Sequence, residues 1–309
     1  MSIDSYLRKT VLRVADLSWV RSLFTKYGMK YGVHRFVAGE TLDAALAQVR
    51  RLNEQGLSVT LDLLGESVYE QKAAEQSVSV IIQTLEAIDK HGLDSHVSVK
   101  LTQLGLCKDT EMCLDHMRKV CHAAEKTGNF IRIDMEDSSV TQATIDLFCS
   151  LLEEFGTNRI GLVIQSYLYR SLPDVNELGK LGANLRIVKG AYNESDKVAF
   201  PLKKNVDLQY ISLVKMHLTN GCYTAIATHD ENMINPLKAF AAQNKIPKER
   251  FEFQMLYGVS TLLQLKLAQE GYRVRVYTPF GVDWYPYFTR RIAERPANLL
   301  FVLKSLLKR

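Results

Sequence analysis

Short apolar runs rich in β-branched residues recur along the chain, and segments with apolar residues at three- and four-residue spacing separate them, as at 77–88 and 206–218. Near-continuous apolar strands that alternate with amphipathic helices indicate a parallel sheet covered by helices. Eight such units within about 250 residues predict an α/β fold of the closed (β/α)₈ TIM-barrel type rather than an open doubly wound sheet. The eight predicted strands are 57–63, 96–101, 129–134, 160–165, 185–189, 223–228, 251–256 and 273–277.

The segments outside these units are predicted to be helical. Residues 1 to about 50 precede the first strand, and residues 284–309 follow the last as an extra C-terminal element over the barrel mouth. The Arg295-Pro296 step is expected to divide that element into two helices. Because no Gly/Ser/Pro-rich linker interrupts the chain, residues 1–309 are predicted to form a single catalytic domain.

Composition narrows the class of protein. The net charge of +5 is dispersed, whereas nucleic-acid binding would require a clustered basic stripe, so no nucleic-acid partner is expected. The five cysteines are odd in number and lack C-x-x-C spacing, which indicates reduced thiols. We find no secretory signal and no run of about 18 apolar residues. A cytoplasmic protein, or one lying peripherally on the inner face of a membrane, is expected.

Several common site motifs are absent from the sequence. No G-x-G-x-x-G or G-x-x-x-x-G-K-[ST] occurs, so a dinucleotide would have to bind by another mode. No G-x-S-x-G supplies a hydrolytic nucleophile. Asp134, Glu136 and His229 are candidate metal ligands, but without H-E-x-x-H spacing they are a weak set, and no metal is expected.

Polar residues stand instead at the carboxyl ends of all eight predicted strands. In a barrel these ends form one mouth, where catalytic side chains gather, so the residues are expected to converge. They are Asp62, Glu66, Lys100, Asp134, Glu136, Gln165, Arg186, Lys189, Thr228, His229, Asp230, Gln254 and Tyr277.

A pair of arginines follows the last strand. Asp283 is placed to cap a helix whose first turn accepts Pro286. Arg290 and Glu294 lie four residues apart and share a face of that helix. Together with Arg291, Arg290 offers a bidentate grip on a carboxylate, although a solvated basic patch explains the pair equally well.

These residues lie within a series of motifs that resembles the proline dehydrogenase family, in particular its short monofunctional bacterial members. The motifs are VSVKLT, IRIDMED, GLVIQSYLYR, LRIVKGAY, ATHD, FEFQMLYG and RVRVYTPFGVDWYPYFTRRIAERPANL, in that order. The resemblance runs from about residue 30 to the C-terminus. It implies oxidation of L-proline to Δ¹-pyrroline-5-carboxylate, with hydride passing to N5 of FAD and electrons passing to a membrane quinone. Peripheral membrane contact follows from that acceptor, whereas the oligomeric state stays open.

The resemblance also implies roles around the substrate. Arg290 and Arg291 would grip the proline carboxylate, and Glu294 would orient Arg290. Tyr277 would pack against the pyrroline ring. Glu66 resembles the family's gate residue, which closes the site by pairing with Arg290.

Further implied roles concern catalysis and the cofactor. Lys100, paired with Asp134, would lie beside the substrate as part of a proton route, with solvent as the other proton acceptor. Arg186 would lie near flavin N5, and Gln165 would hydrogen-bond the flavin ring. The remaining cofactor contacts implied are Met135, Val188, Lys189, Gly190, Ala191, Thr228 and His229.

Two other interpretations remain open at this point. Lys100 or Lys189 at a strand end would also suit a Schiff-base enzyme of the aldolase type. A non-enzymatic barrel that binds a membrane or a partner is the second, because residues 299–307 carry an apolar stripe ending in Lys308 and Arg309. The stripe is also compatible with core packing.

Overall fold

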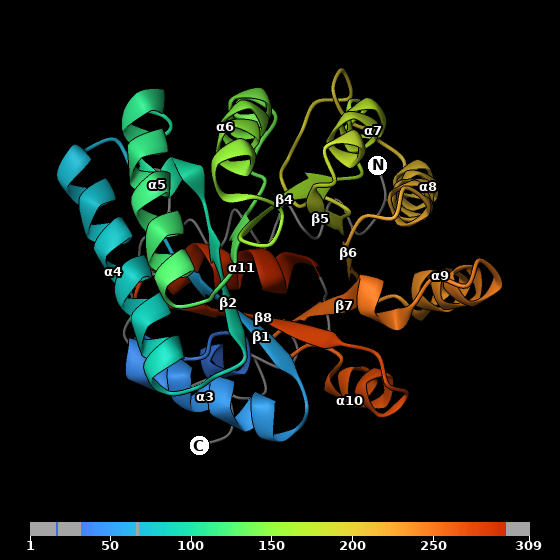
Figure 1. Ribbon diagram of the computed structural model, residues 1–309, viewed down its shortest axis with the longest axis horizontal. Coiled ribbons are helices and arrows are strands. Elements are labelled where there is room, and N and C mark those ends of the chain that lie inside the picture. The colour runs from blue at the N-terminus through green and yellow to red at the C-terminus, as the bar shows by residue number, and fades with distance from the viewer. Residues whose placement is uncertain (1–16, 18–31, 66–67, 295–309) are drawn as a thin grey trace.

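The computed structural model describes residues 17, 32–65 and 68–294. Within them eight parallel strands pair in chain order and close into a barrel, with β1 pairing with both β2 and β8 (Figure 1). The predicted (β/α)₈ barrel is therefore confirmed. Its strands are β1 (Ser58–Leu63), β2 (Ser95–Val99), β3 (Ile131–Ile133), β4 (Ile160–Gln165), β5 (Asn184–Val188), β6 (Thr224–Ala227), β7 (Phe251–Leu256) and β8 (Val274–Phe280).

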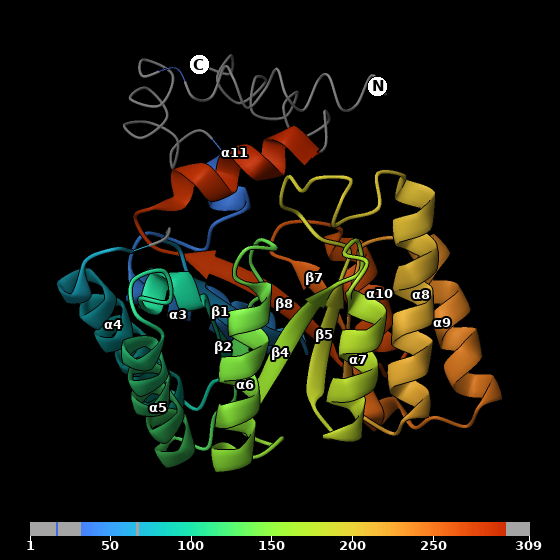
Figure 2. The same ribbon diagram turned by 90° about the horizontal axis from the view of Figure 1, so that it is seen from above.

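Helices surround the barrel as an outer layer, and α11 (Trp284–Glu294) lies across the carboxyl ends of the strands (Figure 2). The outer helices are α3 (Leu42–Glu54), α4 (Gln71–Lys90), α5 (Thr110–Lys126), α6 (Thr141–Phe155), α7 (Ser171–Lys180), α8 (Lys203–Thr219), α9 (Glu231–Gln243) and α10 (Thr261–Gln269). Short 3₁₀ turns occur at η2 (Val33–Arg35), η3 (Leu101–Leu104) and η4 (Lys248–Arg250). No helix in the described part of the chain is long and apolar enough to cross a membrane.

The strand boundaries differ from the sequence prediction in six of the eight strands, by more than one residue in β2, β3 and β8. β2 ends at Val99, because the chain turns into η3 instead of extending to Leu101. β3 keeps only its three central residues of the predicted six. β8 continues to Phe280, which pairs with Leu63 at the end of β1. The helices expected at 1–31, the break at Arg295-Pro296 and the apolar stripe at 299–307 lie outside the described residues.

Helix α11 is held over the mouth by its own small apolar cluster. Trp284 and Phe288 from α11 pack with Val33 and Phe36 from the segment before α3, and all four are buried. The Trp284 indole N–H also donates to Glu40 Oε1 at 2.9 Å. Because aromatic burial of this kind supplies much of the packing energy of a small cluster, α11 has a defined position above the strand ends.

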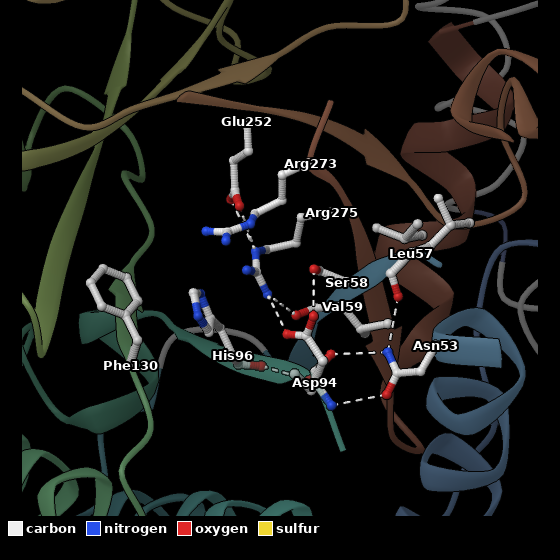
Figure 3. A network of polar contacts seen from close by, with 12 residues as sticks. Asn53, Leu57, Ser58, Val59, Asp94, His96, Phe130, Glu252, Arg273 and Arg275 are labelled. Carbon is white, nitrogen blue, oxygen red and sulfur yellow. Dashed lines mark hydrogen bonds and ion pairs between the residues drawn. The ribbon is translucent and has the colours of Figure 1, made fainter. Parts of the chain in front are cut away.

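The barrel interior is polar rather than filled by apolar layers. Near the amino ends of the strands, Arg275 donates to Glu252 at 3.0 and 3.2 Å and lies 3.7 Å from Asp94. Asp94 accepts from the Ser58 hydroxyl at 2.6 Å and contacts Asn53 of α3 through backbone atoms. We call Asn53, Ser58, Asp94, Glu252 and Arg275 the floor network (Figure 3). Its contacts connect α3, β1, β7 and β8 to the start of β2, where β1 pairs with β8 and closes the barrel.

Candidate active site

A cavity of about 650 Å³ lies at the carboxyl ends of the strands and is lined on one side by Pro286, Tyr287, Arg290 and Arg291 of α11. Of the described strand-end residues expected at the mouth, Glu136 does not line it, because its carboxylate accepts from the amide and hydroxyl of Thr102. Every residue to which the resemblance assigned a role does line it, where the structure describes the side chain. These residues are Lys100, Asp134, Met135, Gln165, Arg186, Val188, Lys189, Gly190, Ala191, Thr228, His229, Tyr277, Arg290 and Arg291. The predicted gate residue Glu66 and the side chain of Glu294 lie outside the described residues.

The partner of Lys100 differs from the one implied by the resemblance. Lys100 Nζ lies 2.5 Å from Asp62 Oδ1 and 3.8 Å from Asp134 Oδ2, so its close partner is Asp62. Asp134 is engaged elsewhere, because it accepts from Arg186 at 2.8 Å and from the Tyr277 hydroxyl at 2.7 Å. The sequence analysis expected Asp62 at the mouth but gave it no role. Its position on β1, beside β2 and therefore beside Lys100, was the signal for the pairing.

Lys100 is a cation in this setting. Burial favours the neutral amine, but Asp62 and Asp134 outweigh that effect and raise the pKa of Lys100 above its usual range. Burial, Asp134 and Asp62 together raise the pKa of Tyr277 well above its usual value, so its hydroxyl stays a donor. A Schiff-base nucleophile requires a neutral amine. The arrangement around Lys100 therefore disfavours the aldolase-type interpretation.

Arg186 presents a donor that the protein does not satisfy. One of its terminal nitrogens binds Asp134 and the other donates to the Ser98 hydroxyl at 3.1 Å, while its guanidinium lies 5.2 Å from the centre of the Tyr277 ring. Its Nε is buried and has no hydrogen-bond acceptor in the described part of the chain. Since buried N–H groups are nearly always paired, this atom indicates a ligand that brings an acceptor.

Two buried glutamine side chains offer hydrogen-bond acceptors to the cavity, whereas Arg186 offers a donor. Gln165 donates its amide nitrogen to the Glu136 carbonyl at 2.6 Å, and Gln254 donates to Glu252 Oε1 at 2.5 Å. With each nitrogen engaged, the carbonyl oxygen of each amide remains as an acceptor on a cavity-lining side chain. Gln254 was identified only as a strand-end residue, and its bond to the floor network explains its fixed position.

The β5–α8 side of the cavity carries basic groups. Lys189 lies 2.8 Å from Asp207 and 3.7 Å from Asp230, and Lys203 lines the same wall. Gly190 has a φ of +112°, and a Cβ there would lie 2.3 Å from the Tyr167 ring. Glycine is thus required for the chain to follow the cavity wall after β5.

The two arginines of α11 face the cavity from above. The helix begins directly after Asp283, with Pro286 in its first turn, as the sequence predicted. Both Arg290 and Arg291 line the cavity, and the Arg291 guanidinium lies 5.3 Å from the centre of the Tyr287 ring. Sequence analysis did not identify Tyr287, Tyr192, Met255 or Leu256 as lining residues. Aromatic and aliphatic residues at such positions are indistinguishable from core residues in the sequence alone.

Fold and site together define a barrel enzyme whose mouth combines buried carboxylates, cations from several strands and an arginine pair on a covering helix. No group of three or more His, Cys, Asp or Glu side chains among the described residues has an arrangement suited to a metal ion.

Comparison with known proteins gives the family. The sequence pattern described as "Proline dehydrogenase" matches residues 45–304, and the chain belongs to the proline dehydrogenase family. It is 45% identical over 303 residues to proline dehydrogenase 1 of Bacillus subtilis subsp. natto, covering 98% of this chain and 100% of that protein. It is 44% identical to proline dehydrogenase of Deinococcus radiodurans, covering 99% of each. The crystal structure of proline utilization A from Bdellovibrio bacteriovorus, inactivated by N-propargylglycine, aligns with a TM-score of 0.81 at 27% identity, over 89% of this chain and 33% of that one.

Proposed function

We propose that this protein oxidises L-proline to Δ¹-pyrroline-5-carboxylate with FAD as its cofactor and a quinone as the electron acceptor, the first step of proline catabolism. Membership of the family supports the reaction class, and so does 44–45% identity to two bacterial proline dehydrogenases over nearly the whole chain. The observation that carries the assignment to this cavity is the buried Arg186 Nε, an unsatisfied donor in a mouth that also presents two amide acceptors. The barrel is proposed to act as a single catalytic domain.

Binding of proline requires groups that recognise its two charges. Arg290 and Arg291 supply fixed guanidiniums for the carboxylate, and guanidinium–carboxylate hydrogen bonds are the stronger, charge-assisted type. Tyr277, whose hydroxyl is tied to Asp134, offers its ring face to the pyrrolidine ring. Proline is thereby oriented between α11 and the strand ends. Glu294 and Glu66 keep the roles implied by the resemblance, as orienting partner of Arg290 and as gate.

The residues present fit a flavin. The Arg186 N–H suits an acceptor on the isoalloxazine ring, and the Gln165 and Gln254 carbonyls suit a ring N–H. The wall formed by Met135, Val188, Lys189, Gly190, Ala191, Thr228 and His229 would hold the rest of FAD, with Lys189 near its phosphates. When bound, FAD supplies the two-electron acceptor that takes the hydride from the ring carbon beside nitrogen.

The protein must also accept a proton from the substrate ammonium. Lys100, Asp62 and Asp134 form a continuous polar contact at the cavity wall. Burial and Asp134 raise the pKa of Asp62, opposed by Lys100, so this carboxylate is a stronger base than an exposed one. We assign the proton route to this cluster, with solvent at the mouth as the final acceptor. The alternative of a non-enzymatic barrel does not account for this cluster of buried charged groups.

The first test is an absorption spectrum of the purified protein, followed by anaerobic addition of L-proline. We expect a yellow protein with flavin absorption that bleaches with proline but not with glycine or alanine, because these two amino acids lack the ring that Tyr277 is proposed to contact. Yellow protein that proline leaves unbleached would redirect the substrate to another amine. A colourless protein that fails to take up added FAD would overturn the proposal.

The electron acceptor leads to a prediction about location. If a quinone in the membrane accepts the electrons, a cytoplasmic enzyme must approach the inner face of the membrane during turnover. We expect the protein to sediment with quinone-containing vesicles at low salt and to leave them as salt screens the contact. Protein that remains wholly in the supernatant at low salt would contradict peripheral association and leave the flavin test unaffected.

A further inference from the structure

One buried cation of the barrel has no ion-pair partner. The inward-facing cations of the described strands and strand ends include Lys100, Arg132, Arg186 and Arg275. Asp62 pairs with Lys100, Asp134 with Arg186, and both Glu252 and Asp94 with Arg275. Arg132 remains, with no carboxylate within 4 Å among the residues that the structure describes.

Arg132 is nevertheless held firmly in place. It is 2% exposed, and it donates to the carbonyls of Leu162 at 3.1 Å and Asn184 at 2.6 Å and to Asn184 Oδ1 at 2.5 Å. All three acceptors are neutral. A Cβ on Gly161 would lie 2.4 Å from the guanidinium, so glycine at this position leaves the space that the guanidinium occupies. The fold therefore maintains a buried cation without a counter-ion.

Such a cation carries an energetic cost that a bound anion would remove. Burial and the nearby Arg186 lower the pKa of Arg132 to about 9, and the charge of Glu252, which forms no ion pair with Arg132, only partly opposes them. A buried charge is normally paired. The missing partner must come from outside the chain if the charge is to be neutralised.

The access route for such a partner is at the opposite end of the barrel from the mouth. Arg132 lines a second cavity of about 890 Å³ at the amino ends of the strands, and it does not line the mouth cavity. His96, Phe130 and Arg273, which Figure 3 labels, also line this floor cavity. Its neutral polar residues include Asn129, Thr157, Asn158, Asn184, Asn220 and Tyr223. Besides Arg132, its charged residues are the basic Lys180, Arg250 and Arg273 and the acidic Asp89, Asp94, Glu249 and Glu252. Amide and hydroxyl donors around a guanidinium suit an oxoanion, which accepts several hydrogen bonds.

We propose that the floor cavity is a binding site for a small oxoanion, phosphate or a short carboxylate, with Arg132 as its central ligand. The site is separate from the mouth and does not depend on the substrate or cofactor proposed above. Bound anion would neutralise the one unpaired cation among the described interior residues and so stabilise the folded protein.

The test uses a substitution that gives Arg132 an internal counter-ion. In Asn184→Asp the new carboxylate replaces the amide whose oxygen already lies 2.5 Å from the guanidinium, with almost no change in shape. Thermal unfolding of the cofactor-loaded protein is followed at constant ionic strength while a bulky sulfonate salt is exchanged for phosphate or, separately, acetate. We expect the midpoint of the unmodified protein to rise in a saturable way, by about 2 °C at ten times the dissociation constant. Asn184→Asp should lose this rise. Saturation by phosphate or by acetate identifies which oxoanion the site prefers.

Asn220→Asp is the matched control, because it places the same new charge on the same cavity without a hydrogen bond to Arg132. It should keep at least half of the rise. An equal rise in the unmodified protein and Asn184→Asp would locate the anion elsewhere, for example at the arginines of α11, and would overturn the proposal. So would the absence of any rise. Crystals soaked in selenate provide a direct measurement, since anomalous scattering should place selenium within hydrogen-bonding reach of Arg132; a map without that peak would also overturn it.

Discussion

Replacing Arg290 with methionine is expected to lower kcat/KM for L-proline by about 2–4 kcal/mol of transition-state stabilisation, roughly 30- to 1,000-fold, while FAD stays bound. Methionine keeps much of the side-chain length but removes the charge that would grip the substrate carboxylate. Because that contact is present in both ground state and transition state, the loss should appear mainly as a higher KM. The same result is expected for Arg291→Met, since both guanidiniums line the cavity from α11.

Steady-state kinetics with a quinone analogue, combined with flavin absorbance per protein, measures both parts of this prediction. Arg118→Met is the matched control. Arg118 is partly exposed, pairs with Glu154 and Asp115 on the outer surface, and does not line the cavity. It should leave KM and flavin content unchanged. An unchanged KM in both α11 variants would remove the arginine pair from the substrate site, and flavin loss in either would indicate a structural role for that residue instead.

The architecture was predictable because apolar strands buried on both faces differ strongly from the amphipathic helices between them. Ile160–Gln165 and Phe251–Leu256 were located to the residue for this reason. Strand ends were less predictable. Leu101 and Thr102 are apolar or β-branched, yet they turn into η3, where the Thr102 hydroxyl and amide both donate to the buried Glu136. That tertiary contact outweighs the local preference and is not visible in the sequence.

Convergence of the site was predictable from topology, whereas its pairings were not. Any parallel barrel brings its strand ends together, which is sufficient to gather Lys100, Asp134 and Arg186. Which carboxylate Lys100 contacts depends on how the side chains are placed within the mouth, and here Nζ lies 2.5 Å from Asp62 and 3.8 Å from Asp134. The polar interior of the barrel was also not predictable from the sequence. Arg132 and Arg275 sit within runs of isoleucine and valine, and alternation alone does not say which face of a barrel strand points inward.

Replacing Glu252 with glutamine is expected to lower the free energy of unfolding at pH 7 by about 3–5 kcal/mol. Glu252 and Arg275 are 1% and 2% exposed, and Glu252 also accepts from Tyr223 at 3.0 Å and from Gln254. Glutamine keeps the shape but leaves the Arg275 charge buried beside a neutral group. Exposed Glu154, paired with Arg118 at 3.0 Å, gives the control: Glu154→Gln should cost about 0–1 kcal/mol. Urea unfolding with linear extrapolation measures both variants, and a loss below 1 kcal/mol for Glu252→Gln would contradict the role given to the floor network.

The same substitution has a pH signature that separates lost charge from lost packing. Burial favours protonated Glu252. The charge of Arg275 and the hydrogen bonds that Glu252 accepts outweigh burial and lower the pKa of Glu252 to about 2, from an ordinary value of 4.5. A lowered carboxyl pKa contributes stability that is full above pH 4.5 and is lost as pH falls toward 2; the difference corresponds to roughly 3 kcal/mol. Unmodified protein and Glu252→Gln should therefore converge in stability as pH falls from 4.5. Parallel stability curves over that interval would show that glutamine disturbs packing and that the charge of Glu252 contributes little. Convergence of the two curves would show that the Glu252–Arg275 ion pair stabilises the floor network.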